Sequence, residues 1–335
     1  MSAGARAAIG RRLESPLARA LCALLLMIVL GCIFNKDGAF FQWSTHRGML
    51  REIAVYGMLA CGMTLVIIAG GIDLSVSSLL ALSAVSFALL TMPHGLPAPI
   101  AIAIVLAAGA GAGALSGALI ARFRIQPFIV TLAMMVFGRG LAKLLSGGKK
   151  VTSYFVGADG VPVTMDHPAI FGLIDAKVLG GNVSIVTLVF LACVIVTHVI
   201  LARLRLGRHI YAVGGSSEAA RLAGVPIARV LVIVYALSGL FAAIAGVCQA
   251  AQETHGDPET GLGYELDAIA MVVIGGTSLA GGRGGVALTL IGALTIGYLQ
   301  KILSINAFST ETRLMLTGAI IICAVLFQRV GRRER

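Results

Sequence analysis

The sequence predicts an all-α, polytopic membrane protein with about ten transmembrane helices and cytoplasmic N- and C-termini. Hydrophobic residues make up 58% of the 335 residues and charged residues only 12%. The mean hydropathy is +0.96, whereas soluble domains are about one quarter charged. The apolar residues also gather in runs close to the roughly 20 residues that a helix needs to cross a bilayer. Finally, the basic residues are concentrated in alternate loops between these runs.

Helices are the expected form because a helix satisfies its own backbone hydrogen bonds, which hydrocarbon cannot do. Aromatic residues are only 6% of the chain and there are 42 glycines, which argues against a β-barrel with aromatic girdles. We expect a tail over 1–16, a membrane domain over 17–328 and a second tail over 329–335. The ten expected spans cover residues 17–34, 53–69, 74–91, 98–120, 128–145, 183–201, 229–250, 264–279, 285–301 and 313–328.

Lysine and arginine are distributed unevenly between the two sides of these spans. With the N-terminus in the cytoplasm, the inside segments hold 16 basic and 4 acidic residues, and the outside segments hold 10 and 11. The two sides then carry net charges of +12 and −1, which together give the chain's +11. Cytoplasmic loops of membrane proteins are enriched in basic residues. The distribution therefore favours an even number of spans in a bacterial inner membrane.

Several function classes are not expected. The basic residues follow the predicted topology, so we expect no nucleic-acid partner. The six cysteines show no CxxC spacing and the six histidines no ligand spacing, so we expect no metal and no cofactor. The sequence contains neither a GxSG nucleophile motif nor a GxxxxGK[ST] phosphate-binding loop. We therefore predict no catalytic residues and no ATPase activity of the chain's own.

The first candidate site is a glycine break in the apolar stretch 53–91. This stretch is too long for one span and is interrupted by Gly70, Gly71, Asp73 and Ser75. A charged residue near membrane depth usually has a function, so Asp73 is a candidate for lining a pathway. The alternative is local: the glycines form the turn, and Asp73 or Ser75 caps the next helix. The two interpretations are compatible.

A second glycine break lies in the other half of the chain. Residues 68–75 and 273–280 both read as an apolar pair, Gly-Gly, two variable residues, Leu and a small residue. Paired glycine-interrupted helices in two halves indicate the central site of a transporter. The second break contributes the candidates Gly275, Gly276, Thr277 and Ser278. By contrast, Gly109, Gly113 and Gly117 share one face of the fourth span and predict close helix packing.

Two polar loops complete the candidates. In the inside loop, about 202–228, Ser216 or Ser217 can cap a short helix that Gly224 ends. Such a helix suits docking to a cytoplasmic partner, although a solvated connector is the alternative. The outside loop, 251–267, carries five acids and no lysine or arginine. It is either a solvated face or a surface that receives basic residues of a partner.

Four blocks of the sequence resemble the permeases of ribose-type carbohydrate ABC importers. They are GMTLVIIAGGIDLSVSSLLALSA at 62–84, QPFIVTLAMM followed by RG at 126–140, GRHIYAVGGSSEAARLAGVPIARV at 207–230 and GYELDAIAMVVIGGTSLAGGRG at 263–284. They occur in the order found in that family. The resemblance implies a permease that forms the membrane pathway for a monosaccharide such as ribose or a related sugar.

The same resemblance implies the partners. These are ATP-binding cassette ATPase subunits, a periplasmic sugar-binding protein and a second permease subunit, in a homo- or heterodimer. It also implies that Ser216, Ser217, Glu218, Ala219, Ala220, Arg221 and Gly224 form the ATPase coupling segment. A branched-chain amino-acid ABC permease is the alternative within the class. An ion-coupled secondary sugar transporter is a further alternative, for which Asp73 and His198 are the only intramembrane candidates.

Overall fold

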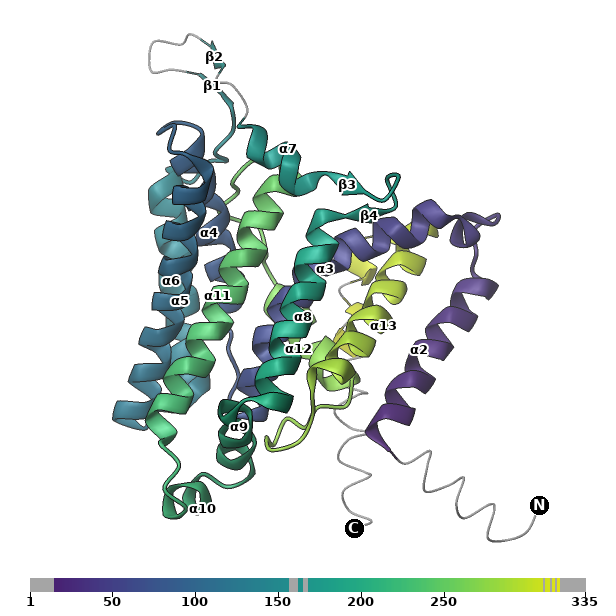
Figure 1. The fold of residues 1–335 in the computed structure, drawn as a ribbon. Helices are drawn as coiled ribbons and strands as arrows, with labels where there is room; N and C mark the ends of the chain where they lie inside the picture. Colours follow the sequence, from purple (N-terminus) through teal and green to yellow (C-terminus); the bar gives the residue numbers. More distant parts are fainter. Residues whose placement is uncertain are drawn as a thin grey trace, which may run out of the picture.

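The computed structural model describes residues 15–156, 162–164, 168–309, 311–313, 315–316 and 318–319, and these residues fold into a bundle of helices (Figure 1). Short strands and helices project from the two ends of the bundle. The helices are α2 (Pro16–Ile33), η1 (Ala39–Phe41), α3 (Trp43–Ile68), α4 (Val76–Thr91), α5 (Ala98–Phe123), α6 (Pro127–Ser146), α7 (Ala169–Asp175), α8 (Ile185–Arg203), α9 (Arg205–Gly215), α10 (Ser217–Leu222), α11 (Ile227–Glu253), α12 (Tyr264–Ile274) and α13 (Val286–Ile305).

Nine of the ten expected spans correspond to helices of the structure. Within the described part of the chain, seven helices are long and apolar enough to cross a membrane: α2, α3, α5, α6, α8, α11 and α13. The spans expected at 74–91 and 264–279 are the shorter helices α4 and α12. Most of the span expected at 313–328, and the tails 1–14 and 329–335, lie outside the described residues. The chain is thus a helical, multi-pass membrane protein.

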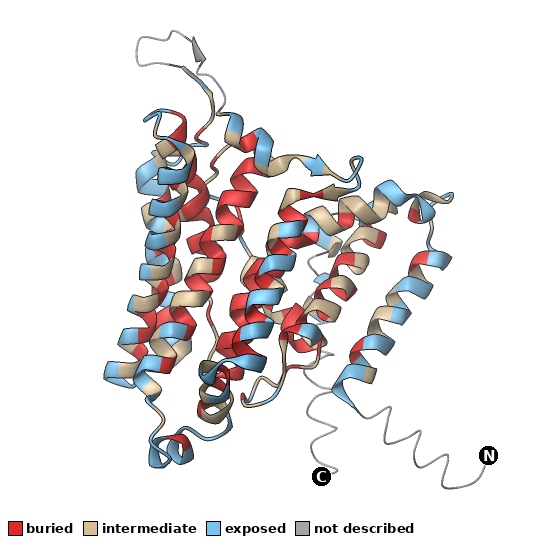
Figure 2. Cartoon of the chain, in the orientation of Figure 1, coloured by how far each residue is buried: buried red, intermediate tan, exposed pale blue. Residues whose placement is uncertain are grey.

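The centre of the bundle is formed by α3 and α11, while α2, α5 and α6 lie at its periphery (Figure 2). In the most apolar window of α3, 83% of residues are buried, against 11% in α2 and 22% in α5 and α6. The outer helices present leucine, isoleucine and phenylalanine outward. In water such a surface would be unstable, but in a bilayer it contacts lipid.

Small residues bring α5 and α11 into backbone contact, as the glycine spacing predicts. A Cβ on Gly113 would lie 2.0 Å from the Tyr235 carbonyl oxygen, and one on Gly109 would lie 2.7 Å from the Gly239 carbonyl oxygen. A Cβ on Gly117 would lie 2.7 Å from the Val232 Cα. Larger residues at these positions would force the two helices apart. The prediction of a glycine packing face is therefore confirmed.

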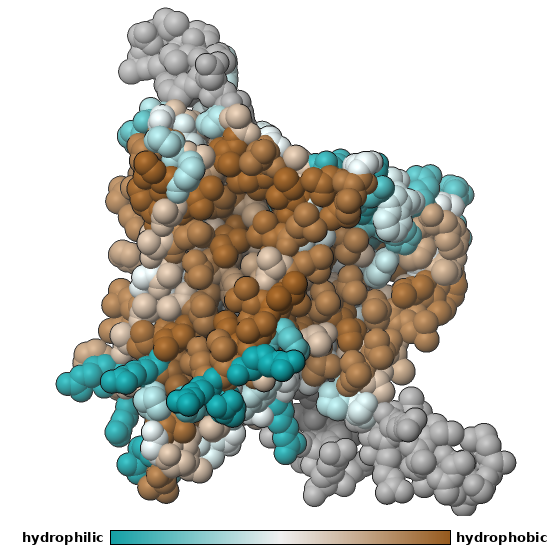
Figure 3. Space-filling model, viewed as in Figure 1, coloured by the Kyte–Doolittle hydropathy of each residue, from teal (hydrophilic) through white to brown (hydrophobic). Residues whose placement is uncertain are grey.

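The extramembrane pieces lie at opposite ends of the bundle (Figure 1). One end carries α7 and two antiparallel hairpins, β1 (Tyr154–Val156) with β2 (Pro162–Thr164) and β3 (Lys177–Val178) with β4 (Val183–Ser184). The other end carries α9 and α10. Between the two ends runs a broad hydrophobic band, with hydrophilic residues above and below it (Figure 3). This distribution matches a bilayer core with polar boundaries.

Candidate functional site

The first glycine break ends α3 through a backbone turn that requires a glycine. Gly70 has a φ of +87°, and its N–H donates to the Ile67 carbonyl at 3.0 Å. The Gly71 N–H donates to the Val66 carbonyl at 3.0 Å. This pair of bonds is the Schellman motif, in which a left-handed residue satisfies the last carbonyls of a helix. A Cβ on Gly71 would lie 2.3 Å from the Tyr235 hydroxyl. Gly70 is therefore required by its backbone conformation and Gly71 by the space available.

Asp73 is fully buried in this break and joins it to α11. Its Oδ1 accepts hydrogen bonds from the Ser75 N–H at 3.0 Å and the Ser75 hydroxyl at 2.6 Å. Its Oδ2 accepts from the Ser238 hydroxyl of α11 at 2.7 Å. No ion pair of Asp73 is found among the described residues. The carboxylate is thus satisfied by hydroxyl and amide donors, as a buried polar group needs to be.

The expected helix cap differs in detail from the structure. Ser75 is the N-cap residue of α4, but its side chain makes no cap hydrogen bond to that helix. Its hydroxyl donates to Asp73 instead, and Asp73 closes a local turn onto the Ser75 N–H. The expectation is therefore borne out for Asp73, whose side chain accepts a backbone N–H where α4 begins, and for Ser75 only in its position. The Ser75 hydroxyl serves as a donor to the carboxylate, which also engages α11.

The second break ends α12 by the same kind of turn. The Gly276 N–H donates to the Val273 carbonyl at 2.9 Å, and the Thr277 N–H donates to the Val272 carbonyl at 3.1 Å. Gly276 has a φ of +103°. The left-handed residue is thus the second glycine of this pair but the first glycine of the pair at Gly70. The two breaks share a backbone motif that is offset by one residue from the sequence correspondence.

Packing explains the glycine that precedes the left-handed residue in the second break. A Cβ on Gly275 would lie 2.2 Å from the Leu288 carbonyl oxygen of α13, so Gly275 serves the contact between α12 and α13. The Thr277 hydroxyl accepts from the Gly285 N–H at 3.4 Å, which holds the loop 275–285. Ser278 closes a turn within that loop, where its N–H donates to the Arg283 carbonyl at 3.0 Å.

The two breaks meet each other and the end of α9. The Gly282 N–H, from the loop after α12, donates to the carbonyl of Ile68, the last residue of α3, at 2.9 Å. Gly214 of α9 packs against both groups, because a Cβ on it would lie 1.7 Å from the Ile68 oxygen and 2.7 Å from the Gly282 nitrogen. We call the contact of Ile68, Gly70, Gly214, Gly281 and Gly282 the glycine junction. Sequence reasoning identified Gly70 but none of the other members.

The expected short helix of the inside loop is present as α10. The Ser216 hydroxyl accepts from the Ala219 N–H at 3.2 Å as the N-cap, and Gly224 follows the helix with a φ of +77°. Glu218 and Arg221 form an exposed pair, and the hydrogen bond from Arg221 lowers the pKa of Glu218 below its ordinary value. Six of the seven expected coupling residues are exposed, namely Ser216, Ser217, Glu218, Ala219, Arg221 and Gly224.

Two side chains of α10 differ from their expected roles. Ala220 is only 4% exposed and faces the chain itself. Leu222, which the sequence analysis does not single out, is 75% exposed. It is the last residue of α10, a helix that lies at the end of the bundle opposite α7 (Figure 1). An apolar side chain exposed among polar ones can contribute buried apolar area to a contact with a partner.

The acidic loop 251–267, which is expected outside, is partly neutralised within the chain. Lys143 pairs with Glu259 at 2.6 Å and Lys150 with Asp257 at 3.1 Å. Partial burial alone would raise the pKa of Asp257, but the Glu259 N–H and the Lys150 ammonium outweigh it and hold the pKa below its ordinary value. The Arg139 guanidinium donates to the carbonyls of Pro258 and Thr260 at 2.6 and 2.8 Å. The loop is therefore attached to α6 and its neighbours.

This loop also carries the chain back into the bundle. Gly256 packs against Ala84 and Ala88 in the second half of α4, whereas Gly261 packs against Ser77 and Leu80 in its first turns. Helix α12 therefore begins beside the start of α4, at the opposite end from Ala88. Such a half-helix, which starts within the membrane region, is a recurrent element of transporter sites.

A pair of tyrosines lies at the start of this half-helix. The rings of Tyr56 (α3) and Tyr264 (α12) are 4.2 Å apart between centroids, with an interplanar angle of 35°, and both are half-buried. One turn along α12, Asp267 accepts from the Gln300 amide of α13 at 3.4 Å. Tyrosine, amide and carboxylate groups of α3, α12 and α13 thus lie near one another. Because Tyr56 and Gln300 are 244 positions apart, the sequence does not reveal this grouping.

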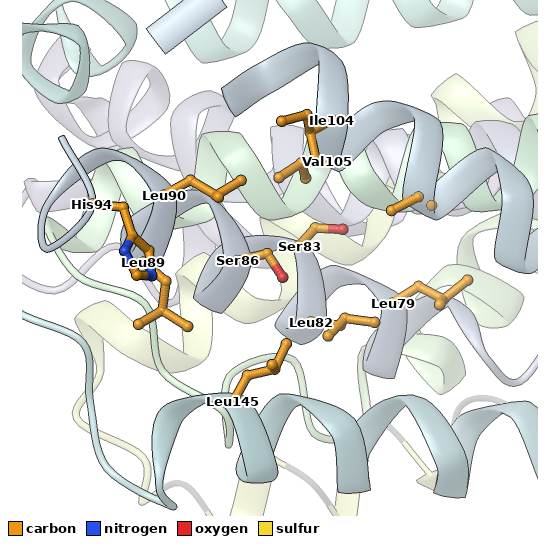
Figure 4. A pocket seen from close by; sticks show the side chains of 12 residues that line it. Leu79, Leu82, Ser83, Ser86, Leu89, Leu90, His94, Ile104, Val105 and Leu145 are labelled. Carbon is orange, nitrogen blue, oxygen red and sulfur yellow. The ribbon is translucent and has the colours of Figure 1, made fainter. Parts of the chain in front are cut away.

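A cavity beside α4 is a poor match for a polar substrate (Figure 4). It has a volume of about 270 Å³ and lies between α4, α5 and Leu145 of α6. Leucine, isoleucine, valine and alanine line most of it, and Ser83, Ser86 and His94 supply its polar side chains. A sugar needs several convergent hydrogen-bond partners. We therefore do not assign the substrate pathway to this cavity.

Comparison with known proteins identifies relatives over almost the whole chain. A family model described as "Branched-chain amino acid transport system / permease component" matches residues 47–325. The ribose import permease protein of Escherichia coli (strain K12) is 39% identical over 309 residues, 92% of each chain. The ribose import permease protein of Bacillus subtilis (strain 168) is 38% identical over 91% of this chain and 90% of that protein. The L-arabinose transport system permease protein of Escherichia coli (strain K12) is 35% identical over 94% of this chain and 91% of that protein. No solved structure matches.

Proposed function

Because this chain belongs to the permease family of binding-protein-dependent transport systems, we propose that it forms the membrane pathway for a monosaccharide in an ATP-driven importer. The observation that carries the proposal is the similarity to sugar import permeases over more than nine tenths of the chain. The chain is a transport component and not an enzyme. Ribose, arabinose and fructose import permeases are all among its relatives. A sugar is therefore favoured over a branched-chain amino acid.

We infer ten spans, with both termini in the cytoplasm of a bacterial inner membrane. The even number follows from the charge distribution, because a tenth span at 313–328 returns the basic C-terminal tail to the cytoplasmic side. The opposite placement of α7 and α10 in Figure 1 is consistent with this arrangement. Under it, α7 and the hairpins face the periplasm, and α9 and α10 face the cytoplasm.

The proposed partners follow from the same arrangement. We infer that α10 docks into a cleft of an ATP-binding cassette ATPase, with Leu222 as its apolar anchor and Ser217, Glu218 and Arg221 around it. A periplasmic sugar-binding protein delivers the substrate to the opposite face. A second permease subunit, identical or different, completes the membrane part. A secondary transporter is not favoured, because the carboxylate of Asp73 is fully engaged by Ser75 and Ser238.

We infer that the substrate passes the tyrosine pair and the two helix breaks. Tyr56 and Tyr264 offer aromatic rings against which the apolar face of a sugar ring can lie. Asp267 and Gln300 offer the acceptors and donors that sugar hydroxyls require. Polar groups of this kind are costly beside lipid and are usually found along a pathway. Gly70, Gly71, Gly275 and Gly276 then shape the backbone below this point.

Uptake by the reconstituted importer tests the proposal. The affinity-tagged permease is purified from its native host with the ATPase that accompanies it, and is placed in proteoliposomes with ATP inside. Labelled ribose, arabinose, fructose and leucine are then offered outside with the periplasmic binding proteins of that host. We expect ATP-dependent uptake of a sugar that persists with a protonophore. Uptake of leucine alone, or sugar uptake without ATP, would contradict the proposal.

A further inference from the structure

We propose that Gly214 is a positioning residue that transmits movement of the ATPase-docking helix α10 to both helix breaks. The proposal rests on the proposed function, since it takes α10 as the docking helix. It goes beyond that function by naming the contact through which ATP-driven movement reaches the pathway. The contact is the glycine junction, in which Gly214 touches the end of α3 and the loop after α12 at the same time.

The first step is that α9 and α10 are joined without a connecting loop. Helix α9 ends at Gly215 and α10 begins at Ser217, so a single residue separates them. That residue, Ser216, is the C-cap of α9, where its N–H donates to the Ala212 carbonyl at 3.1 Å. It is also the N-cap of α10. With both helices capped at one residue, a displacement of α10 is passed to the end of α9.

The second step is that the end of α9 touches backbone atoms. A Cβ on Gly214 would lie 1.7 Å from the Ile68 oxygen. One on Gly281 would lie 3.0 Å from the Gly70 Cα and 3.1 Å from the Gly214 Cα. A contact between main chains has no rotatable side chain that could absorb a displacement. Movement of Gly214 must therefore move Ile68, Gly282 or both.

The third step is that a side chain reinforces the same connection. The Tyr211 hydroxyl, one turn before Gly214 on α9, donates to the Gly284 carbonyl at 2.8 Å. The Gly282 N–H in turn donates to the Ile68 carbonyl. Helix α9 is thus attached to the loop 275–285, and that loop is attached to the end of α3. A single element on the cytoplasmic side contacts both breaks, which have corresponding positions in the two halves of the chain.

The neighbouring glycine provides a matched control. A Cβ on Gly215 would meet no atom within 4 Å, and Gly214 and Gly215 both belong to α9 without a left-handed φ. Gly214→Ala and Gly215→Ala therefore make the same chemical change in adjacent helical positions. Only the first obstructs the junction. Tyr211→Phe is a milder variant, since it removes one hydrogen bond and keeps the ring.

The experiment measures coupling and local structure separately in the full importer. Couplings between sites typically change an affinity or activity by about 5- to 150-fold. We expect Gly214→Ala to lower sugar uptake and sugar-stimulated ATP hydrolysis by about tenfold or more, with co-purification of the ATPase unchanged. Gly215→Ala should remain near wild type, and Tyr211→Phe should lie between the two. Normal uptake and stimulation in Gly214→Ala, or an equal loss in Gly215→Ala, would overturn the proposal.

Amide hydrogen exchange provides a readout that does not depend on transport. In the wild type, adding the ATPase to the purified permease should change protection over 69–75 and 278–285. In Gly214→Ala this response should be lost while protection over α10 still changes. If Gly214→Ala does not insert into the membrane, the same comparison is made with Tyr211→Phe, and an unaltered response in that variant overturns the proposal. An ATPase that leaves α10 unaffected in the wild type would contradict the docking assignment itself.

Discussion

The Ser238 hydroxyl donates a 2.7 Å hydrogen bond to Asp73 Oδ2, which ties the middle of α11 to the loop between α3 and α4. Asp73 is fully buried, and its other oxygen is held by Ser75. The bond thus joins one of the two central helices of the bundle to the first glycine break. Removing one partner of a buried hydrogen bond leaves the other unsatisfied, which costs about 1–3 kcal/mol.

The first prediction compares two replacements of Asp73. Asp73→Asn keeps an acceptor for Ser75 and can donate to the Ser238 oxygen, so we expect sugar uptake within about threefold of wild type. Asp73→Leu removes the acceptor of three buried donors, the Ser75 N–H and the hydroxyls of Ser75 and Ser238, so we expect loss of uptake. Initial uptake rates, normalised to permease in the membrane, are the measurement. Ser238→Ala serves as the control, with an expected loss of about 1–3 kcal/mol in stability. Full activity of the leucine variant would remove Asp73 from any role in the break.

The second prediction concerns the attachment of the acidic loop 251–267 through Asp257 and Lys150. Val151 and Gly256 are paired by two backbone hydrogen bonds: the Val151 N–H donates to the Gly256 carbonyl at 2.8 Å, and the Gly256 N–H donates to the Val151 carbonyl at 2.9 Å. Asp257→Lys should speed amide hydrogen exchange at both residues. The double change Asp257→Lys and Lys150→Asp should restore protection, because it restores the ion pair. Partly exposed pairs contribute up to about 1 kcal/mol, so the unfolding temperature should change little. Lys149→Asp is the control with a nearby charge reversal, and unaltered exchange in Asp257→Lys would refute the attachment.

The same ion pair gives a pH dependence with a definite sign. The folded pKa of Asp257 lies below its ordinary value, which is about 3.9 in unfolded peptides. A depressed carboxyl pKa contributes stability above the unfolded value and loses it as the pH falls through the folded pKa. Protection at Val151 and Gly256 should therefore be constant between about pH 5 and 8, after correction for intrinsic exchange. A decrease on acidification from pH 8 to 6 would show that another group controls the loop.

The third prediction tests Leu222 as the anchor of the ATPase contact. Leu222→Asp places a charge where an apolar contact is expected and should weaken co-purification of the ATPase by roughly 30-fold, since burial of a leucine side chain contributes about 1.5–3 kcal/mol. Leu179→Asp changes a leucine of similar exposure, 73% against 75%, at the opposite end of the molecule. It should leave ATPase binding unchanged. Substitution of Ala220 is not an informative test, because Ala220 is buried against the chain itself.

The sequence predicts helices well where hydrophobic length is decisive. The spans over α2, α5 and α13 begin within one residue of the expected positions. Helix α3 begins at Trp43, ten residues before the expected 53, because His46, Arg47 and Arg51 interrupt the apolar run without interrupting the helix. Arg51 is paired with Asp175 and Arg47 donates to the Gly181 carbonyl. Polar residues that are satisfied by neighbouring loops are thus compatible with a membrane helix, although they lower its hydropathy.

The glycine breaks show which details depend on packing. Both breaks are evident from sequence, but the left-handed glycine is the first of the pair at Gly70 and the second at Gly276. The other glycine of each pair serves packing: Gly71 meets the Tyr235 hydroxyl and Gly275 the Leu288 carbonyl of α13, contacts that no local pattern reveals. The glycine junction is hidden for the same reason. Ile68, Gly214 and Gly282 are far apart along the chain. Several of the 42 glycines make no close contact at all, so the presence of a glycine does not by itself predict a contact.

The fourth prediction places the two ends of the bundle on opposite sides of the membrane. A fused reporter that is active only outside the cytoplasm should be active after residue 180 and inactive after residue 215. The charge distribution also predicts an inactive reporter at the C-terminus. The reason is that α7 and α10 lie at opposite ends of the hydrophobic band. A reporter inactive at 180 would invert the topology, and one active at the C-terminus would contradict the tenth span.

The last prediction tests whether sugar passes the tyrosine pair. Tyr264→Ala removes the ring that lies 4.2 Å from Tyr56 and should lower maximal uptake by about tenfold, because aromatic contacts contribute roughly 0.5–1.5 kcal/mol each. Tyr264→Phe keeps the ring and should retain most uptake. Tyr298→Ala removes another half-buried tyrosine, packed against Phe40 and His46, and controls for loss of packing alone. The decisive measurement is the ratio of ribose to arabinose uptake with both binding proteins present. A ratio that changes in Tyr264→Ala but not in Tyr298→Ala places the ring in contact with the sugar, and an equal loss without a changed ratio would remove the pair from the pathway.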